Sequence, residues 1–232
     1  MNGPLVTVVI PVHNGESFLG QAIESALRQD YQPVEVLVLD DGSDDGSRPI
    51  AASYGDVRCI SQQQAGAAAA RNAGLRMARG SFVAFLDHDD VMVPSRLSRQ
   101  VGFLLGHPDV DCTLGRMEFF LEPGSSWPQW LQGDLRDHRR PWIHPTSLVG
   151  SRDTLVGLGG FDIEFQFSEE HDLLFRMRES GLRIEILDEV VIRRRIHDSN
   201  LTHTLGDGRW MLNSLKSHLD RARALRAAQR KP

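Results

Sequence analysis

Residues 82–90 read Phe-Val-Ala-Phe-Leu-Asp-His-Asp-Asp and change abruptly from apolar to acidic. The first five are typical of a strand buried on both faces of a parallel sheet. In open α/β sheets, ligands bind beyond the carboxyl ends of the strands, where these carboxylates would lie. Carboxylates this close repel one another unless a cation joins them, and hard oxygen ligands suit Mg²⁺ or Mn²⁺. On this segment alone, a solvated acidic turn is an equally good interpretation.

A second acidic turn follows the apolar run at 34–39. Residues 40–47 read Asp-Asp-Gly-Ser-Asp-Asp-Gly-Ser, and all of these residue types favour turns. A calcium-binding loop that begins at Asp41 would need a bidentate Glu at its twelfth position, where Ala52 stands, so we exclude it. Two acidic turns at two strand ends favour one shared polar crevice.

The first half of the chain alternates strands and helices. Apolar runs predict strands at 5–10, 34–39, 57–60, 82–86 and 110–114. Helical spacing predicts helices at 18–27, with Asn14 as N-cap, at 65–78, and from Pro94 to about residue 105. This order predicts a parallel sheet with right-handed crossovers. Beyond residue 115 we predict a glycine-rich turn at 157–162, a helix that begins near residue 168, and strands at 183–186 and 190–196.

Composition sets the broad class. A chain of 232 residues with 41% hydrophobic content can bury a full core, as one large domain or two small ones. The net charge of -5 gives no general attraction to nucleic acid. We find no apolar run of membrane-spanning length and no leader-like N-terminus. Cys59 and Cys112 lie in apolar runs and are most simply reduced thiols, so we predict a cytoplasmic protein without a cysteine metal site.

Short motifs along the chain resemble those of family 2 glycosyltransferases, which have the GT-A nucleotide-sugar fold. They are the opening strand and loop at 8–15, the acidic turn at 40–43, the helix motif at 70–74, the DxD segment at 85–90, the catalytic-base region at 159–162 and 169–173, and the closing motif at 195–202. Each is weak alone, but they run in the family's order. The resemblance implies a single α/β domain with a GT-A-like, Rossmann-related, mostly parallel sheet flanked by helices.

The resemblance also divides the chain. Residues 1–205 would form the GT-A-like domain, with a nucleotide-sugar-binding half at 1–115 and an acceptor and catalytic half at 116–205. Residues 206–232 would form a basic, amphipathic helical segment. This segment could rest on anionic lipid at the inner face of the membrane, where a lipid-linked acceptor would be presented. A solvated helix or a subunit contact explains it equally well.

The nucleotide site that the resemblance implies lies at the first two strand ends and in the DxD segment. Asp41 would accept a hydrogen bond from the base, most often uracil, and Arg71 would lie against the nucleotide. Without the resemblance, Arg71 would be interpreted as a solvated helix cation. The complete nucleotide-binding set is Pro11, Val12, His13, Asn14, Asp41, Arg71, Asp87 and His88. His13 departs from the family, which commonly has Tyr at that position.

The later motifs imply the metal ligands and the general base of the reaction. The resemblance makes Asp89 the direct ligand of Mn²⁺ or Mg²⁺ and directs His197 at the metal or the diphosphate, although a capping role for His197 is nearly as good. The metal would bridge both phosphates as a Lewis acid. Glu170 would be the general base, where the family usually has Asp. Because of this departure, Glu169 and Asp172 remain alternatives. For these two residues we favour a structural role, since acids at a helix N-terminus complement the helix dipole.

The implied reaction is inverting, metal-dependent transfer of a sugar from a nucleotide-sugar, with a UDP-sugar as the expected donor. The acceptor is a saccharide, a lipid-linked glycan, a natural product or a peptide. A non-catalytic nucleotide-sugar-binding module of the same fold is the alternative. A NAD-dependent dehydrogenase is excluded, because residues 11–15 read Pro-Val-His-Asn-Gly where that class needs a Gly-x-Gly-x-x-Gly turn.

Overall fold

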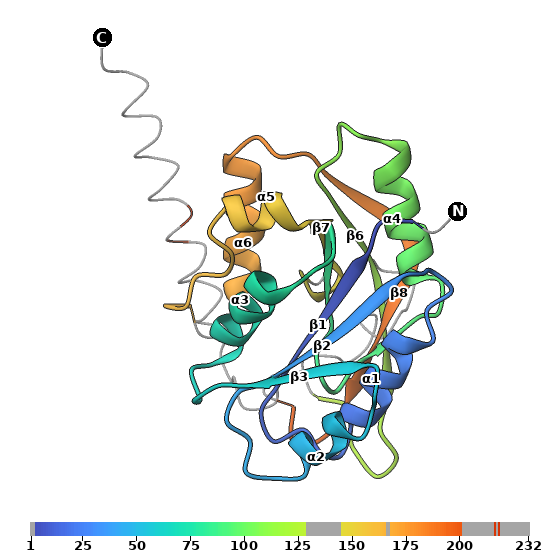
Figure 1. Cartoon of the computed structure of the whole chain (residues 1–232), viewed down its shortest axis with the longest axis vertical. Helices are drawn as coiled ribbons and strands as arrows, with labels where there is room; N and C mark the ends of the chain where they lie inside the picture. Colours follow the sequence, from blue (N-terminus) through green and yellow to red (C-terminus); the bar gives the residue numbers. More distant parts are fainter. Residues whose placement is uncertain (1–2, 129–144, 166–167, 201–215, 217, 219–232) are drawn as a thin grey trace.

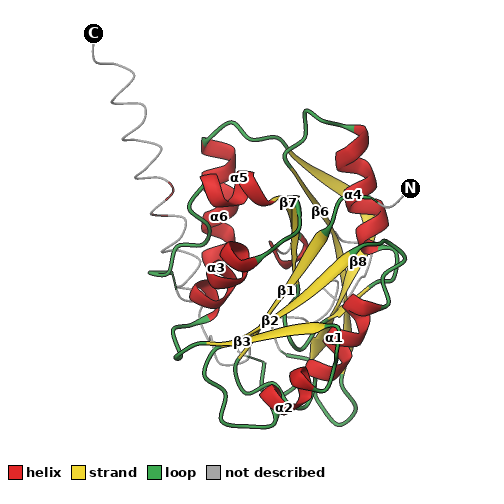
Figure 2. Cartoon of the chain, viewed as in Figure 1, coloured by secondary structure: helices red, strands yellow, loops and turns green. Residues whose placement is uncertain are grey.

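The computed structural model describes residues 3–128, 145–165, 168–200, 216 and 218. Within these residues, eight strands form one sheet in the order β3-β2-β1-β4-β7-β6-β8-β5. Helices cover both faces of the sheet (Figures 1 and 2). The predicted α/β class with flanking helices is therefore confirmed. The predicted helix at 206–232 and the end of the closing motif lie outside the described residues, apart from Lys216 and His218.

The first half of the sheet is parallel. Its strands are β1 (Val6–Val12), β2 (Val34–Asp40), β3 (Val57–Ser61) and β4 (Phe82–Phe85). Strand β1 is central, since it pairs with both β2 and β4, and each of its residues is buried. The register sets Val12 beside Asp40 and Val9 beside Phe85, so both acidic turns leave the same edge of the sheet. The strands predicted from apolar runs in this half are confirmed to within two residues.

Two apolar cores sandwich this sheet. Helices α1 (Leu19–Leu27), α2 (Ser47–Ala52) and α4 (Arg96–Gly106) pack on one face, against Val6, Val8 and Ile10. Helices α3 (Ala67–Met77), α5 (Arg152–Gly157) and α6 (Glu169–Glu179) pack on the other, against Val9 and Phe85. Alternate residues of one strand serve opposite cores, which is why the run in β1 is almost continuously apolar.

The second half of the sheet is mixed. Strand β7 (Val149–Ser151) runs antiparallel to β4 and to β6 (Cys112–Leu121), while β6 is parallel to β8 (Ile184–Ile196). The two-residue strand β5 (Val91–Met92) pairs antiparallel with β8. Of the seven pairings among the described strands, the four β1–β2, β1–β4, β2–β3 and β6–β8 are parallel. A short 3-10 turn (Pro145–Ser147) precedes β7.

The second half corrects several predictions. The strands predicted at 183–186 and 190–196 are one strand, and the run at 110–114 is only the start of β6. Asp188 and Glu189, between the two predicted strands, lie near a register shift between Leu114 and Arg116, where Arg116 pairs with Asp188. Strands β5 and β7 and helices α2 and α5 were not predicted. All four are short, so their apolar patterns cover too few residues to be recognised.

The predicted starts of two helices are wrong. Helix α1 begins at Leu19 with Phe18 at the N-cap position, and Asn14 lies upstream in the left-handed region, with φ of 53°. The Asn14 side chain instead accepts a hydrogen bond from the backbone N–H of Asp44. It therefore links the loop after β1 to the acidic turn after β2. Helix α4 begins at Arg96 after Ser95, so Pro94 precedes the helix rather than standing in its first turn.

Two further sequence predictions concern the cysteines and membrane-spanning segments. Cys59 and Cys112 are free thiols, as expected, and burial raises the pKa of the Cys112 thiol well above its usual range. Within the part of the chain that the structure describes, no helix combines the length and apolar character that a membrane span needs.

Gly74 tests the packing of α3 on the sheet. A Cβ at this position would lie 2.3 Å from Cγ1 of Val9 and 3.1 Å from Cδ2 of Leu39. We expect Gly74→Ala to destabilise the protein by about 1–3 kcal/mol in urea unfolding, because overpacking outweighs the helix propensity of alanine. Gly102→Ala in α4 is the matched control, because its Cβ would meet no atom within 4 Å, and it should stabilise by up to about 1 kcal/mol. A Gly74→Ala protein as stable as this control would contradict the packing.

Candidate active site

An acidic loop follows β4 directly. Asp87, Asp89 and Asp90 can each present one carboxylate oxygen within 4.8 Å of the other two. The loop is braced from β8, where the backbone N–H of Arg195 donates to Oδ1 of Asp90 at 3.0 Å and Nε of Arg195 donates to the backbone oxygen of Asp89 at 3.0 Å. Three carboxylates held this close create a site with a strong preference for positive charge.

Asp90 is a site residue that the sequence interpretation missed. Its side chain is buried, and its Oδ2 has no hydrogen-bond partner among the described residues. Burial, together with the charge of Asp89, raises the pKa of Asp90 well above its usual range. A buried carboxylate oxygen without a donor is the kind of group that a bound cation satisfies, and the all-oxygen donor set suits Mg²⁺ or Mn²⁺. The residues present therefore fit a divalent metal.

Asp89 is held by the end of β8 and the turn that follows it. Its Oδ2 lies 3.2 Å from Nε2 of His197 and accepts a hydrogen bond from Nδ2 of Asn200 at 3.1 Å. Burial alone would raise the pKa of Asp89, but the hydrogen bond with His197 and the nearby charge of His88 outweigh it and hold the pKa below its usual range. The structure thus brings both predicted metal residues, Asp89 and His197, into contact.

Arg71 joins the acidic loop to helix α6. Its Nη2 lies 2.8 Å from Oδ1 of Asp87 and 3.0 Å from Oε1 of Glu170, and its Nη1 donates to Oε1 of Glu169 at 2.7 Å. The side chain is only 5% exposed, so the solvated helix cation is ruled out. Burial would lower the pKa of Arg71, but the three carboxylates raise it further, so the guanidinium stays charged.

The next residue on α3 makes a second link, to the turn that precedes α6. Nδ2 of Asn72 donates to the backbone oxygen of Phe161 at 2.7 Å, and its Oδ1 accepts from the backbone N–H of Phe161 at 2.8 Å. The Phe161 ring then packs edge-on against Phe85 at the end of β4, with centroids 5.0 Å apart. Two adjacent polar residues of α3 therefore fix the turn at 159–162 and the start of α6 against the sheet.

The acids of α6 have different environments. Oε2 of Glu169 is buried without a hydrogen-bond partner in the described structure, and burial, reinforced by the charge of Glu170, raises the pKa of Glu169 to about 7. Asp172 is fully buried and accepts from Nε of Arg176 at 2.7 Å, while the same guanidinium also donates to the backbone oxygens of Leu158 and Gly160. These contacts favour the structural interpretation for Asp172, because they anchor the glycine-rich turn.

The residues predicted to hold the nucleotide base gather at the ends of β1 and β2. Asp41 is buried, and its carboxylate accepts from the backbone N–H groups of Ala65 and Gly66 at 2.9 and 2.8 Å and from Nε2 of Gln62 at 2.7 Å. A carboxylate can accept about four hydrogen bonds, which leaves room for one more. Nδ1 of His13 lies 3.0 Å from the backbone oxygen of Asp41. Pro11 and Val12 are buried in β1 beside Leu39 and Asp40.

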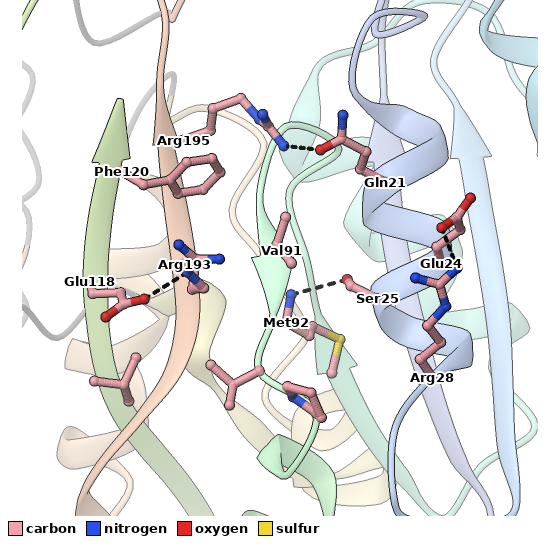
Figure 3. Close-up of a pocket in the computed structure, with 13 residues that line it drawn as sticks. Gln21, Glu24, Ser25, Arg28, Val91, Met92, Glu118, Phe120, Arg193 and Arg195 are labelled. Carbon is pink, nitrogen blue, oxygen red and sulfur yellow. Dashed lines mark hydrogen bonds and ion pairs between the residues drawn. The ribbon is translucent and has the colours of Figure 1, made fainter. Parts of the chain in front are cut away.

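His88 and Arg195 fasten the acidic loop to its neighbours. The His88 ring packs on Gly15, where an added Cβ would lie 2.3 Å from it. The Arg195 guanidinium lies 4.7 Å from the ring centroids of Phe18 and of Phe120, and its Nη2 donates to Oε1 of Gln21 at 2.6 Å. Figure 3 shows Arg195 at the rim of a groove of about 650 Å³ that lies between α1, β5, β6 and β8. The sequence interpretation included Arg195 in the closing motif but gave it no role.

Comparison with known proteins identifies the family. Residues 7–158 match the model of glycosyl transferase family 2. The chain belongs to the family 2 glycosyltransferases. It is 31% identical over 214 residues to an uncharacterised glycosyltransferase of Rickettsia typhi, an alignment that covers 87% of this chain and 67% of the relative. A Rickettsia prowazekii glycosyltransferase is also 31% identical, over 230 residues that cover 94% of this chain and 70% of the relative.

Solved structures support the fold. The S. aureus TarS fragment 1–349 in complex with UDP superposes with a TM-score of 0.66 at 22% identity, and the match covers 84% of this chain and 61% of TarS 1–349. The complex of the same fragment with UDP-GlcNAc gives a TM-score of 0.67 over 86% of this chain and 60% of that one. This glycosyltransferase therefore has the predicted GT-A fold and spans about 60% of the TarS fragment and about two thirds of the Rickettsia typhi relative.

The raised pKa of Glu169 predicts a pH dependence of stability. Because the folded protein binds this proton more tightly than the unfolded chain, the stabilisation is full below about pH 4.5 and is lost as the pH rises to about 7. Glu169→Gln mimics the protonated acid, so its advantage over the wild type should grow between pH 5 and pH 8, by up to a few kcal/mol in the free energy of unfolding.

Urea unfolding at both pH values measures this difference. Glu164→Gln, in an exposed loop, controls for the loss of one acidic group. A difference between Glu169→Gln and wild type that does not change with pH would contradict the assignment of a raised pKa to Glu169.

Proposed function

We propose that this glycosyltransferase moves a sugar from a UDP-sugar to an acceptor nucleophile with inversion, assisted by Mn²⁺ or Mg²⁺. One observation carries the proposal: Nη2 of Arg71 contacts both Asp87 of the DxD segment and Glu170 of the acidic pair. The candidate metal loop and the candidate base therefore share one cation and belong to one site. Arg71, from the motif at 70–74, also contacts Glu169, from the motif at 169–173. These two residues are 98 positions apart in the sequence.

The carboxylate loop would hold the metal. Asp89 is the proposed direct ligand, with Asp87 and Asp90 close enough to contribute, and the metal when bound would supply Lewis-acid stabilisation of the departing diphosphate. His197 and Asn200 orient Asp89 through its Oδ2. At the other end of the site, Asp41 and His13 would hold the base of the nucleotide. Pro11, Val12 and Asn14 lie around these two residues. The UDP and UDP-GlcNAc complexes of TarS support a uridine donor.

Glu170 is the better base of the acidic pair. It shares Nη2 of Arg71 with Asp87, whereas Glu169 is bonded to Nη1, so Glu170 is the acid more closely linked to the proposed metal loop. Inversion in one displacement needs a carboxylate that takes the acceptor's proton as its oxygen or nitrogen attacks. The pKa of Glu169, raised to about 7, would suit a general base at neutral pH, so Glu169 remains the alternative.

The acceptor class stays open in this proposal. A saccharide, a lipid-linked glycan, a natural product and a peptide all remain consistent with the site. Contact of the basic segment at 206–232 with a membrane stays a prediction, as does the division of the domain into halves at residue 115.

The metal assignment predicts a linkage between UDP and the divalent ion. UDP at ~100 times its dissociation constant should stabilise the wild type by about 2.7 kcal/mol with Mn²⁺ present, and by much less with chelator. Asp89→Asn should remove the metal-dependent part and leave the unliganded protein folded. Asp153→Asn, at a side chain 94% exposed on α5, is the control and should behave as wild type. Thermal melts measure each case, and equal stabilisation of Asp89→Asn and wild type would refute the assignment.

The base assignment predicts a loss in the chemical step. Glu170→Gln keeps the shape of the side chain but removes the proton acceptor, so turnover should fall by about 10²–10⁴-fold with little change in UDP affinity. Glu169→Gln should lower turnover far less, and Asp172→Asn should lower the melting temperature more than the rate. If Glu169→Gln abolishes transfer while Glu170→Gln does not, the two roles are exchanged. If neither Glu169→Gln nor Glu170→Gln loses transfer activity, the result would support a non-catalytic acidic cluster.

A further inference from the structure

The side chain of Arg195, near the end of β8, joins three separate parts of the chain. Its Nε donates to the backbone oxygen of Asp89 at 3.0 Å, and its Nη2 reaches Oε1 of Gln21 on α1 at 2.6 Å (Figure 3). Its Nη1 pairs with Glu122, just beyond β6. The side chain is only 4% exposed, so these contacts hold it in one conformation. Arg195 therefore ties the acidic loop to α1 and to the end of β6.

Phe18, at the start of α1, links Arg195 to the carboxylate of Asp89 as well. The Arg195 guanidinium lies 4.7 Å from the centroid of the Phe18 ring, and the His197 ring packs against the same ring with centroids 4.5 Å apart. Nε2 of His197 in turn lies 3.2 Å from Oδ2 of Asp89. Asp89 is thus held at its backbone oxygen by Arg195, and at its carboxylate by a His197 ring that shares Phe18 with Arg195.

Arg195 holds the acidic loop without occupying the oxygens that a metal would use. Its Nε bonds to a backbone oxygen of the loop, and its charge is paired with Glu122 on the other side. Its backbone N–H takes Oδ1 of Asp90, while Oδ2 has no partner in the described part of the chain. A guanidinium bonded to the carboxylates themselves would compete with a divalent ion for their oxygens. The contacts of Arg195 avoid that competition.

The unliganded loop needs such support. Its carboxylates lie close together and repel one another, so a loop without restraints would lower its energy by moving them apart. A loop that already has the binding arrangement does not lose conformational freedom when the ion binds, and this preorganisation increases affinity. The ties from Arg195 to α1 and to the end of β6 provide that restraint.

We propose that Arg195 is a positioning residue that holds Asp89 in the arrangement that binds the divalent ion. It acts on the metal through the Asp89 backbone and through the shared contact with Phe18, and it does not itself touch the metal or the donor. The inference rests on the proposed function, because the metal site is part of that proposal. It adds the residue that sets the affinity of the site from outside the ligand set.

The affinity of the Arg195→Met protein for Mn²⁺ tests the proposal. The electron paramagnetic resonance signal of free Mn²⁺ gives this affinity without any measurement of transfer. We expect it to fall by about 10- to 100-fold, as is typical when a residue that orients a metal ligand is lost. Uridine affinity without metal should stay within about twofold of wild type, because the proposed base site lies at the ends of β1 and β2. Arg195→Lys replaces the planar donors with one ammonium group and should recover only part of the loss.

Arg193→Met is the matched control. It removes a guanidinium from the same side of the same strand, where Arg193 pairs with Glu118 rather than with the acidic loop, and it should bind Mn²⁺ as wild type does. Gln21→Ala removes one anchor of Arg195 at an exposed position and should lower Mn²⁺ affinity by about 2- to 10-fold. Where Arg195→Met does not fold, Gln21→Ala carries the test, and an Mn²⁺ affinity equal to wild type then contradicts the proposal.

The double variant with Asp89→Asn separates positioning from a general structural role. If Arg195 acts through Asp89, Arg195→Met should lower Mn²⁺ affinity much less in the Asp89→Asn protein than in wild type, because the two changes remove the same interaction. Equal factors in both proteins would mean that Arg195 does not act through Asp89.

Two further results would overturn the inference. Mn²⁺ affinity equal to wild type in a folded Arg195→Met protein would mean that the loop keeps its arrangement without the guanidinium. Equal losses for Mn²⁺ and for uridine would mean that Arg195 only maintains the fold. A wild-type protein that binds no Mn²⁺ would instead refute the proposed metal site itself, so the failure of the proposed function and that of the inference are distinguishable.

Discussion

The carboxylates of the acidic loop and of α6 repel one another, and the structure depends on a buried cation, Arg71, that offsets this repulsion. Its guanidinium holds Asp87 of the DxD loop and both acids at the start of α6. Removal of one partner from a buried ion pair typically costs about 3–5 kcal/mol, because a charge is left uncompensated. Arg71 lies on α3, the helix that packs closely on β1 and β2 through Gly74.

A second buried cation supports the loop from behind. Arg96 is fully buried, and it donates from Nη1 to the backbone oxygen of Phe85 at 3.0 Å and from Nη2 to that of Thr146 at 2.8 Å. Burial lowers the pKa of Arg96 to about 9, while Asp87 and Asp90 oppose the change. The acids therefore have fixed positive charge on the protein side. On the open side they have the site that we assign to a metal.

The sequence predicted the parts of the molecule that depend on local pattern. The apolar runs of β1 to β4 and the acidic turns after β2 and β4 placed the candidate site at the edge of the sheet from which both turns leave in the structure, and family motifs named most of its candidate residues. The burial of Arg71 could not be predicted without the family, because its partner Glu169 is 98 residues away. Asp90 was missed because its environment comes from β8, and β8 was split in two because its acids lie beside an irregular register.

The proposed function requires the carboxylates after β4 to bind a metal that holds the diphosphate of a UDP-sugar. Anomalous diffraction from crystals grown with UDP and Mn²⁺ can locate that metal. We expect a manganese peak at the Asp89 carboxylate and the diphosphate, with uracil beside Asp41 and His13. Ordered UDP with manganese absent from Asp89, or bound elsewhere in the protein, would contradict it.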